Sequence, residues 1–265
     1  KLGYDLARFR IRREEASRGL ITVPENIHMS TWITQIKDHA PDLKLHVLTA
    51  DTRISVSEIR KSSADLFVMN HAGLQVYMTE LSAKKKSNRK ERKVNPDMAV
   101  EFATLFDFLL MDEIHRMKSH DSLTFDLHWW LSLRCPFRYA FTGTPFGRYP
   151  EYLWPQFKLI DHGETLGTHL KLFRAAFFTA KANFFGGVDY TFRKDMIEEL
   201  NRVIKHRSLS YTTEELDVRL PKQLSLRIPV EMSAEGKMFY SRIVKRIREQ
   251  RGDYRSVESN YIRMR

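Results

Sequence analysis

Five short apolar runs recur along the first 141 residues of the chain, and each run is continuous rather than alternating. They lie at residues 20–23, 45–48, 66–69, 106–111 and 139–141. A strand that is apolar at successive positions is buried on both faces, as in a parallel sheet covered by helices. Parallel neighbours need crossovers of a dozen or more residues, and the gaps between the runs supply them. The pattern therefore predicts an α/β fold with a doubly wound, mostly parallel sheet.

Changes in local residue composition divide the chain into three predicted parts. Residues 1–148 contain the apolar runs, and residues 149–207 form an aromatic-rich helical extension. Residues 208–265 are a linker and the beginning of a second domain, because a new strand-like run lies at 224–230. The aromatic side chains of the extension lack the interleaved pattern of a base-stacking surface, so we expect them in a core. They are Trp154, Phe157, Phe173, Phe177, Phe178, Phe184 and Phe185.

Two further segments have a predicted local structure. Residues 4–18 are expected to form a helix that leads directly into the first strand. Residues 84–93 contain seven basic side chains and no large apolar one, so we expect a solvated loop. The loop either keeps the protein soluble or follows a phosphate backbone. A charge run carries no geometry of its own, which favours the first reading slightly.

Charge and cysteine content narrow the class of protein. The formal net charge is +11, which suits a polyanionic partner such as nucleic acid, but a merely basic protein has the same charge. Cys135 is the only cysteine, so an intrachain disulfide and a cysteine-based zinc site are excluded. The charged start carries no signal-peptide core, and no apolar stretch is long enough for a membrane span. We expect an intracellular protein that is not membrane-bound.

The strongest chemical signal is the end of the fourth apolar run, where Asp112 and Glu113 follow the strand and His115 comes two residues later. Ligands of open α/β sheets gather at the carboxyl ends of the strands. One carboxylate of such a pair holds nucleotide-bound magnesium through water, and its neighbour orients and deprotonates an attacking water. The alternative without a catalytic role is a strand that ends in a solvated acidic turn.

This Asp-Glu-Ile-His string resembles motif II, the Walker B box, of superfamily 2 helicases. The resemblance implies that Asp112 binds magnesium through water, that Glu113 is the catalytic base for ATP hydrolysis, and that His115 connects to motif III. The longer string DEIHRMKS, with Ser122 beyond it, is similar to the Swi/Snf form of this motif. On the same resemblance, Lys118 is expected to contact nucleic acid.

A second motif follows the fifth apolar run. Thr142, Gly143, Thr144 and Pro145, with Tyr-Leu-Trp at residues 152–154, resemble motif III of the Swi/Snf type. By the resemblance the first three residues couple the nucleotide site to nucleic acid. From the residues alone, the hydroxyls can donate hydrogen bonds and the glycine lets another backbone approach closely. RNA helicases of the superfamily usually carry Ser-Ala-Thr here, which favours duplex DNA over RNA.

Two upstream strand ends match the same family. Pro24 after the first run, with Trp32 in the helix that follows, resembles motif Ia, which lies near the nucleic-acid backbone. Pro24 is therefore a candidate nucleic-acid contact, whereas we expect Trp32 to pack a helix on the sheet. His71, after the third run, is either a backbone contact or an ordinary helix cap.

The resemblance implies ATP and Mg²⁺ as cofactors and a RecA-like P-loop NTPase lobe as the fold. No GxxxxGK[ST] sequence occurs, although its backbone amides and lysine would cradle the phosphates. We expect this loop before Lys1, and the arginine motifs of the second helicase lobe after Arg265. The 265 residues alone are then expected to be inactive.

The predicted function is an ATP hydrolase that couples hydrolysis to movement along duplex DNA. Two alternatives remain: a helicase subunit of a restriction or defence system, and a nucleic-acid-binding module that does not hydrolyse ATP. Expected partners are duplex DNA, the second lobe, and other proteins of a replication or defence complex. Compact motif spacing suggests a bacterial or phage protein in the cytoplasm; a eukaryotic version would be nuclear.

Overall fold

The structure is a computed structural model that describes residues 2–83, 90–145, 149–184, 186–211, 215, 226 and 231–249. Contacts divide the chain into two units, Lys1–Leu209 and Ser210–Arg265. The second unit has one described element, helix α10 (Ala234–Glu249). Apart from Leu226, the strand predicted at 224–230 lies outside the described residues.

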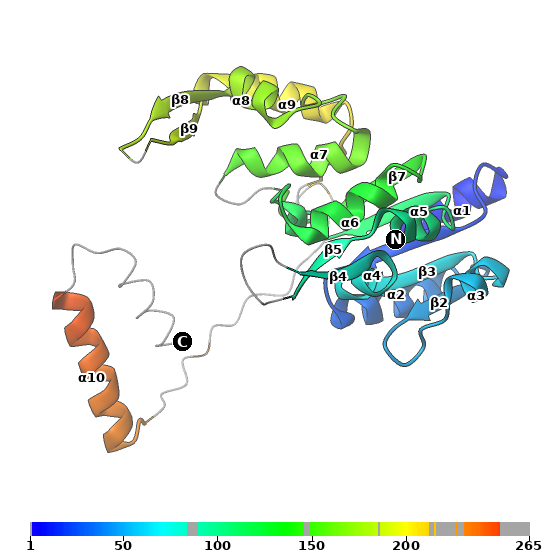
Figure 1. Ribbon diagram of the computed structural model, residues 1–265, viewed down its shortest axis with the longest axis horizontal. Coiled ribbons are helices and arrows are strands. Elements are labelled where there is room, and N and C mark those ends of the chain that lie inside the picture. Colours follow the sequence, from blue (N-terminus) through cyan, green and yellow to red (C-terminus); the bar gives the residue numbers. More distant parts are fainter. Residues whose placement is uncertain are drawn as a thin grey trace. The chain divides into compact units, whose positions relative to one another are not determined.

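A five-stranded parallel sheet forms the centre of the first unit (Figure 1). Its strands are β1 (Gly19–Val23), β2 (Leu45–Leu48), β3 (Leu66–Asn70), β6 (Phe108–Asp112) and β7 (Phe137–Phe141). They lie in the order β2-β3-β1-β6-β7, and each neighbouring pair is parallel. The predicted α/β architecture with a parallel sheet is confirmed. The fourth strand begins two residues later than predicted, because the side chain of Asp107 binds the segment before β1.

Helices cover both faces of this sheet, which explains why the strand sequences are continuously apolar. They are α1 (Leu2–Arg12), α2 (Asn26–His39), α3 (Val56–Lys61), α4 (His71–Met78), α5 (Pro96–Ala103) and α6 (Leu123–Ser132). Alternate residues of β1 point into two different cores: Leu20 packs with the core of α3 to α6, and Ile21 with that of α1 and α2. Burial on both faces removes apolar surface from water at every position of the central strands.

The first helix is shorter than predicted. It ends at Arg12 rather than continuing to residue 18, and Glu14 has a left-handed backbone with φ of 57°. The physical reason lies in the next residues, whose backbone N–H groups are taken by a distant side chain. Asp107 accepts hydrogen bonds from the N–H groups of Ser17 and Arg18, so these groups leave the helix and lead into β1.

The predicted basic loop is partly a strand, so the prediction is wrong for residues 90–93. Strands β4 (Thr79–Ala83) and β5 (Lys90–Val94) form an antiparallel hairpin. Glu80 lies opposite Lys93 in its register, and such opposite charges support cross-strand pairing. Residues 84–89 lie outside the described residues.

The extension after β7 has its own core but belongs to the first unit. It contains η2 (Pro150–Tyr152), α7 (Leu153–Asp161), α8 (Leu170–Phe177), β8 (Phe178–Ala182), β9 (Val188–Phe192), η3 (Lys194–Met196) and α9 (Ile197–Lys205). Five of the seven aromatic residues expected in a core are buried, namely Trp154, Phe157, Phe173, Phe177 and Phe178. The prediction is wrong for Phe184, which is 97% exposed beyond β8, and Phe185 lies outside the described residues. The extension is not wholly helical either, since β8 and β9 form a hairpin.

Candidate functional site

The predicted site residues follow the carboxyl ends of four neighbouring strands. Because the sheet is parallel, these ends meet at one edge: Val23 is paired with Asn70, and Asp112 with Phe141. This carboxyl edge is where ligands of open α/β sheets bind. Pro24, His71, Glu113 and Thr142 are the residues immediately after β1, β3, β6 and β7 respectively.

Asp112 is the last residue of β6, and each of its carboxylate oxygens accepts one hydrogen bond. The backbone N–H of Glu113 donates to Oδ1 at 3.0 Å. The indole Nε1–H of Trp32 donates to Oδ2 at 2.8 Å. Trp32 packs a helix on the sheet as expected, and its indole N–H in addition binds this carboxylate. The carboxylate is held in one orientation by two donors, one local and one from α2.

Glu113 bends the chain sharply as β6 ends. Its backbone is left-handed, with φ and ψ both 50°, a conformation that costs a non-glycine residue about 1 kcal/mol. Strand alternation stops here, and the 3₁₀ helix η1 (Ile114–Met117) begins directly afterwards. Such strain persists only where the surroundings hold the residue in place. The surroundings here are the side chains of His115 and Thr142.

Glu113, His115 and Thr142 form a compact cluster across the ends of β6 and β7. Nδ1 of His115 lies 2.9 Å from Oε2 of Glu113 and 3.0 Å from Oγ1 of Thr142. A carboxylate only accepts hydrogen bonds, so the short contact to Glu113 requires the proton on Nδ1. The Thr142 hydroxyl donates to the same Oε2 at 3.4 Å and accepts the backbone N–H of Thr144 at 3.1 Å. The structure thus brings together residues of the two strongest sequence motifs.

Gly143 does not have the steric role expected of it. A Cβ atom built at this position meets no described atom within 4 Å, so the expected close approach of another backbone is not found. Both Gly143 and Thr144 are exposed at the carboxyl edge. Their coupling role stays a prediction.

The three predicted nucleic-acid contacts lie at the same edge of the sheet. Pro24 is half-buried between β1 and α2, and exposed Lys118 follows η1 with its Nζ 5.6 Å from the Tyr152 ring centroid. His71 is the first residue of α4 and does not cap it. The cap is Asn70, whose side chain accepts the N–H of Gly73 at 2.7 Å. Nucleic-acid contact by these three residues stays a prediction.

A pair of packed histidines behind the carboxyl edge, one buried and one half-buried, was not identified from the sequence. His128 on α6 is fully buried, and its ring lies edge-to-face with that of His71 at 4.9 Å. Nδ1 of His128 lies 2.7 Å from the carbonyl of Thr124, which only accepts, so this nitrogen donates. Nε2 is then the acceptor for the hydroxyl of Thr22 on β1, at 3.0 Å. A lone histidine in the apolar stretch LTFDLHWWL was the one available signal.

Burial lowers the pKa of both histidines. The pKa of His71 falls to about 2 through burial and through the charges of His128, Arg116 and His28. Burial lowers the pKa of His128 to about 4, against a smaller opposite effect of its hydrogen bond to Thr124. Both rings are therefore neutral at physiological pH, and His128 keeps the tautomer that accepts from Thr22.

The oxygen ligands at the carboxyl edge fit a magnesium ion that arrives with a nucleotide. Within the described ranges, no group of three or more His, Cys, Asp or Glu side chains could hold a metal ion by itself. Magnesium needs no such cage, because it binds through one or two carboxylates together with water and substrate phosphates. Asp112, oriented by two donors, is the side chain suited to this contact.

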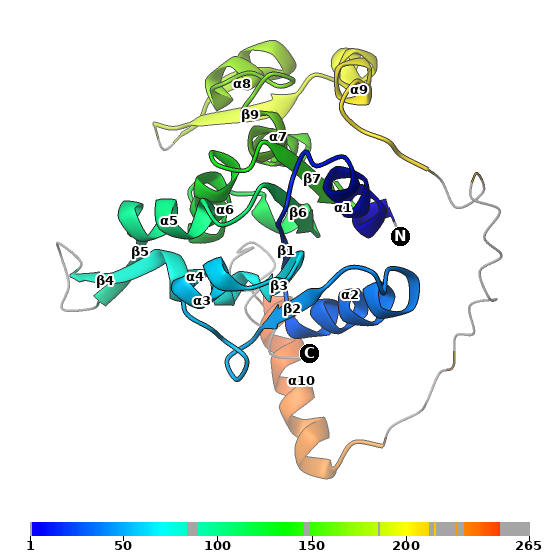
Figure 2. The same ribbon diagram turned by 90° about the vertical axis from the view of Figure 1, so that its right-hand side faces the viewer.

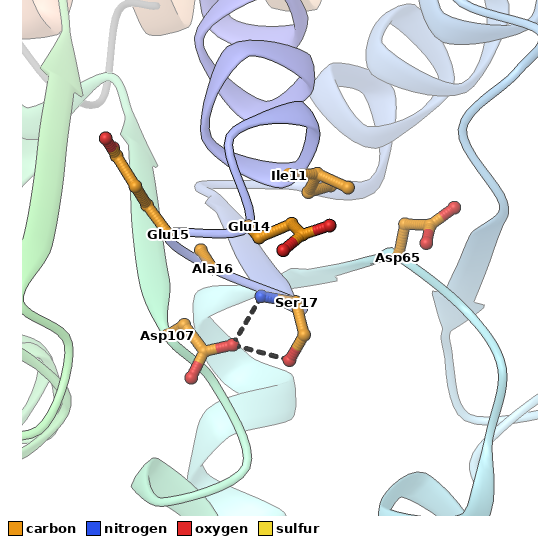
Figure 3. Close-up of a pocket in the computed structure, with 7 residues that line it drawn as sticks. All are labelled: Ile11, Glu14, Glu15, Ala16, Ser17, Asp65 and Asp107. Atoms are coloured by element: carbon orange, nitrogen blue, oxygen red, sulfur yellow. Dashed lines mark hydrogen bonds between the residues drawn. The ribbon is translucent and has the colours of Figure 1, made fainter.

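A second acidic cluster surrounds a cavity at the opposite, amino edge of the sheet (Figure 3). The cavity has a volume of about 520 Å³ and is lined by Ile11, Glu14, Glu15, Ala16, Ser17, Asp65 and Asp107. Two of its carboxylates, Asp65 and Asp107, bind backbone N–H groups of neighbouring segments. Asp107 accepts the N–H and hydroxyl of Ser17, each at 2.7 Å, and Asp65 accepts the N–H of Lys44 at 2.7 Å. This cavity is a junction of chain segments rather than a catalytic centre.

Comparison with known proteins identifies the family. A family model, the SNF2-related domain, matches residues 6–263, nearly the whole chain. The chain belongs to the SNF2-related domain family. No curated protein matches the chain. The predicted Swi/Snf resemblance is confirmed, and a bacterial or phage origin stays a prediction.

Two solved structures of this family have the same fold. The Sulfolobus solfataricus SWI2/SNF2 ATPase core in complex with dsDNA superposes with a TM-score of 0.54 at 18% identity, covering 97% of this chain and 48% of that one. The SWI2/SNF2 ATPase core domain of the same organism gives a TM-score of 0.52 at 17% identity, with the same coverage. The chain thus spans about half the length of each. The predicted RecA-like α/β fold is confirmed.

Among the described residues, no helix is both long enough and apolar enough to cross a bilayer.

Proposed function

We propose that this chain forms the front, nucleotide-handling half of an ATP-driven translocase that moves along duplex DNA. The observation that carries the proposal is the Glu113 cluster. A strained glutamate at the end of a buried strand is held by His115 and by Thr142 of the neighbouring strand end. Membership of the SNF2-related domain family supports an ATPase of this kind. The solved relative bound to dsDNA supports duplex DNA as the track.

The residues have separate tasks in the proposed reaction. Asp112 holds nucleotide-bound magnesium through water, and the ion when bound neutralises charge on the phosphates. Glu113 orients the attacking water and accepts its proton. Both side-chain contacts of Glu113 fall on Oε2, so they hold the carboxylate while Oε1 accepts the proton. Thr142 contacts the proposed base, Glu113, and lies at the end of β7. It therefore connects the site of hydrolysis to the carboxyl edge, where the predicted nucleic-acid contacts lie.

Hydrolysis in this proposal needs groups beyond those of the 265 residues. A phosphate-binding loop must hold the nucleotide, and a cation from a second lobe must stabilise the transition state, which is worth ~10³–10⁵ in rate. The test compares the 265-residue chain with a longer chain that has both parts. We expect DNA-stimulated ATPase activity only in the longer chain. Rapid turnover by the 265 residues alone would place the nucleotide site elsewhere. A longer chain that binds DNA without hydrolysing ATP would instead be a binding module.

Binding to DNA should occur mainly through phosphates, given the net charge of +11. Log K should then fall with log [salt] with a slope of about −0.9 for each phosphate neutralised on duplex DNA. Affinity measured on duplexes of unrelated sequence should vary little, since phosphate contacts carry no sequence information. Tighter binding to duplex RNA than to duplex DNA would contradict the proposed track.

A further inference from the structure

Trp32 connects the helix after Pro24 to the carboxylate at the end of β6. It lies on α2, 80 residues before Asp112 in the sequence, and its Nε1–H donates to Oδ2 of Asp112 at 2.8 Å. The other oxygen of Asp112 accepts the N–H of Glu113 at 3.0 Å. One donor on each oxygen fixes the plane of the carboxylate. Only one of the two donors belongs to β6 and the bend that follows it.

The indole ring also contacts two further elements, α1 and β7. A Cβ atom at Gly3 of α1 would lie 2.4 Å from Cη2 of Trp32, so the ring lies directly against the helix backbone. The ring also contacts Phe141 of β7, with ring centroids 6.1 Å apart. Helices α1 and α2 lie on the same side of the sheet (Figure 2). The ring is thus fixed by α1 and β7 while its one polar atom reaches Asp112.

We propose that Trp32 is a positioning residue that sets the orientation of the Asp112 carboxylate and ties it to α2. The inference rests on the proposed function and deepens it. A group that orients a metal-binding carboxylate commonly changes metal affinity 10–100-fold when it is removed. Because α2 begins two residues after Pro24, a shift of α2 on the nucleic-acid side reaches Asp112 through this hydrogen bond.

A purely structural role for Trp32 makes different predictions. If packing were its whole contribution, Trp32→Phe would keep most of the aromatic contact and leave metal affinity unchanged. Gly3→Ala adds a methyl group that displaces the ring under either role, but a packing role predicts no change in metal affinity. On our proposal both variants weaken metal binding. The first removes the donor, and the second displaces the ring that carries the donor.

The first measurement detects the hydrogen bond without relying on ATPase activity. In the 265-residue chain, the indole ¹H–¹⁵N resonance of Trp32 should shift when Asp112 is replaced by Asn, and its proton should exchange slowly with solvent. The indole resonance of Trp130, which lies on α6 at the other face of the sheet, should not move. An unshifted, fast-exchanging Trp32 proton would overturn the proposal.

The second measurement uses the longer chain with a phosphate-binding loop and second lobe. Mn²⁺ binding to the nucleotide complex, followed by electron paramagnetic resonance, should weaken about tenfold in Trp32→Phe and in Gly3→Ala. The matched control Trp130→Phe should bind like wild type. Equal affinity in Trp32→Phe and Trp130→Phe would overturn the proposal. A wild-type chain that binds no metal–nucleotide would instead contradict the proposed function, and the resonance experiment still reads the contact between Trp32 and Asp112.

Discussion

Carboxylates gather at both ends of the same parallel strands, yet the two clusters differ in what holds them. At the amino edge, Asp107 accepts backbone N–H groups from Ser17 and Arg18, and Glu15 is paired with Arg10 and Arg13. At the carboxyl edge, Trp32 and Thr142 of other segments contact Asp112 and Glu113, and the Glu113 N–H and His115 add local contacts.

The difference lies in what each hydrogen bond does. Backbone N–H groups that bind Asp107 bring two chain segments into register before β1 and β6. Removal of the Asp107 carboxylate would leave the N–H groups of Ser17 and Arg18 without these partners, so Asp107 serves stability. Side-chain donors at the carboxyl edge orient Asp112 and Glu113 but close no backbone junction. An acidic cluster is therefore a candidate for catalysis when its hydrogen-bond donors orient the carboxylates. It is a structural cluster when those donors are backbone groups that join two chain segments.

The largest expected difference between the two edges is in activity. Glu113→Gln in the longer chain should lower DNA-stimulated ATPase activity by about 10²–10⁴-fold, because the amide cannot take the proton of the attacking water. The matched change at the amino edge, Glu14→Gln, should leave the rate unchanged, since Glu14 lines the other cavity. Steady-state ATPase assays at saturating DNA measure both. A Glu113→Gln rate within a few-fold of wild type would remove Glu113 from the role of base.

The second difference is in the pH at which each edge loses stability. Below pH 6.5 the unfolded chain protonates His71 and His128, whereas the folded chain does not until pH falls to about 2 and about 4. The free energy of unfolding should therefore decrease as pH falls from 6.5, by about 1.4 kcal/mol per pH unit for each histidine. At the amino edge, burial raises the pKa of Asp107, but hydrogen bonds from Ser17 and Arg18 outweigh it and the pKa lies below 3.8. The stability that Asp107 contributes should be lost only at a pH below the range in which the two histidines begin to destabilise the fold.

Urea unfolding between pH 6.5 and 5 tests whether the histidines and Asp107 affect stability over different pH ranges. His128→Gln should reduce the pH slope by about one histidine's share, which is about 1.4 kcal/mol per unit. Asp107→Asn should lower stability without changing the slope in this range. An unchanged slope in His128→Gln would show that the buried histidine does not carry the effect.

The smallest expected difference concerns one glycine at each edge. A Cβ atom at Gly19, where β1 begins, would lie 2.0 Å from the ring of Phe108, so Gly19→Ala should lower the free energy of unfolding by about 1–3 kcal/mol. Gly143→Ala at the carboxyl edge should change it by less than about 0.5 kcal/mol, because no described atom is within 4 Å. Urea unfolding at pH 7.5 compares them. Equal losses would mean that Gly143 is more tightly packed than its surroundings indicate.

Much of the fold could be predicted because it depends on local patterns. Continuous apolar runs predicted the parallel sheet, and the string around Asp112 and Glu113 predicted the end of a buried strand. The hairpins β4–β5 and β8–β9 were not predicted. Their strands carry charged and exposed residues, and cross-strand pairing rather than apolar patterning defines them.

The sequence by itself determined the parallel α/β architecture, the order of the motifs and the identity of the chemical side chains. A strand that is apolar at every position must be buried on both faces, and this pattern can be read directly from the sequence. Tertiary structure alone decided which carboxylates are engaged by the backbone and which are oriented for chemistry. It also decided the partners of Trp32 and His128, which lie 80 and 106 residues away in the sequence. Hydrogen bonds over such separations depend on how helices pack across the sheet, and no local pattern encodes that geometry.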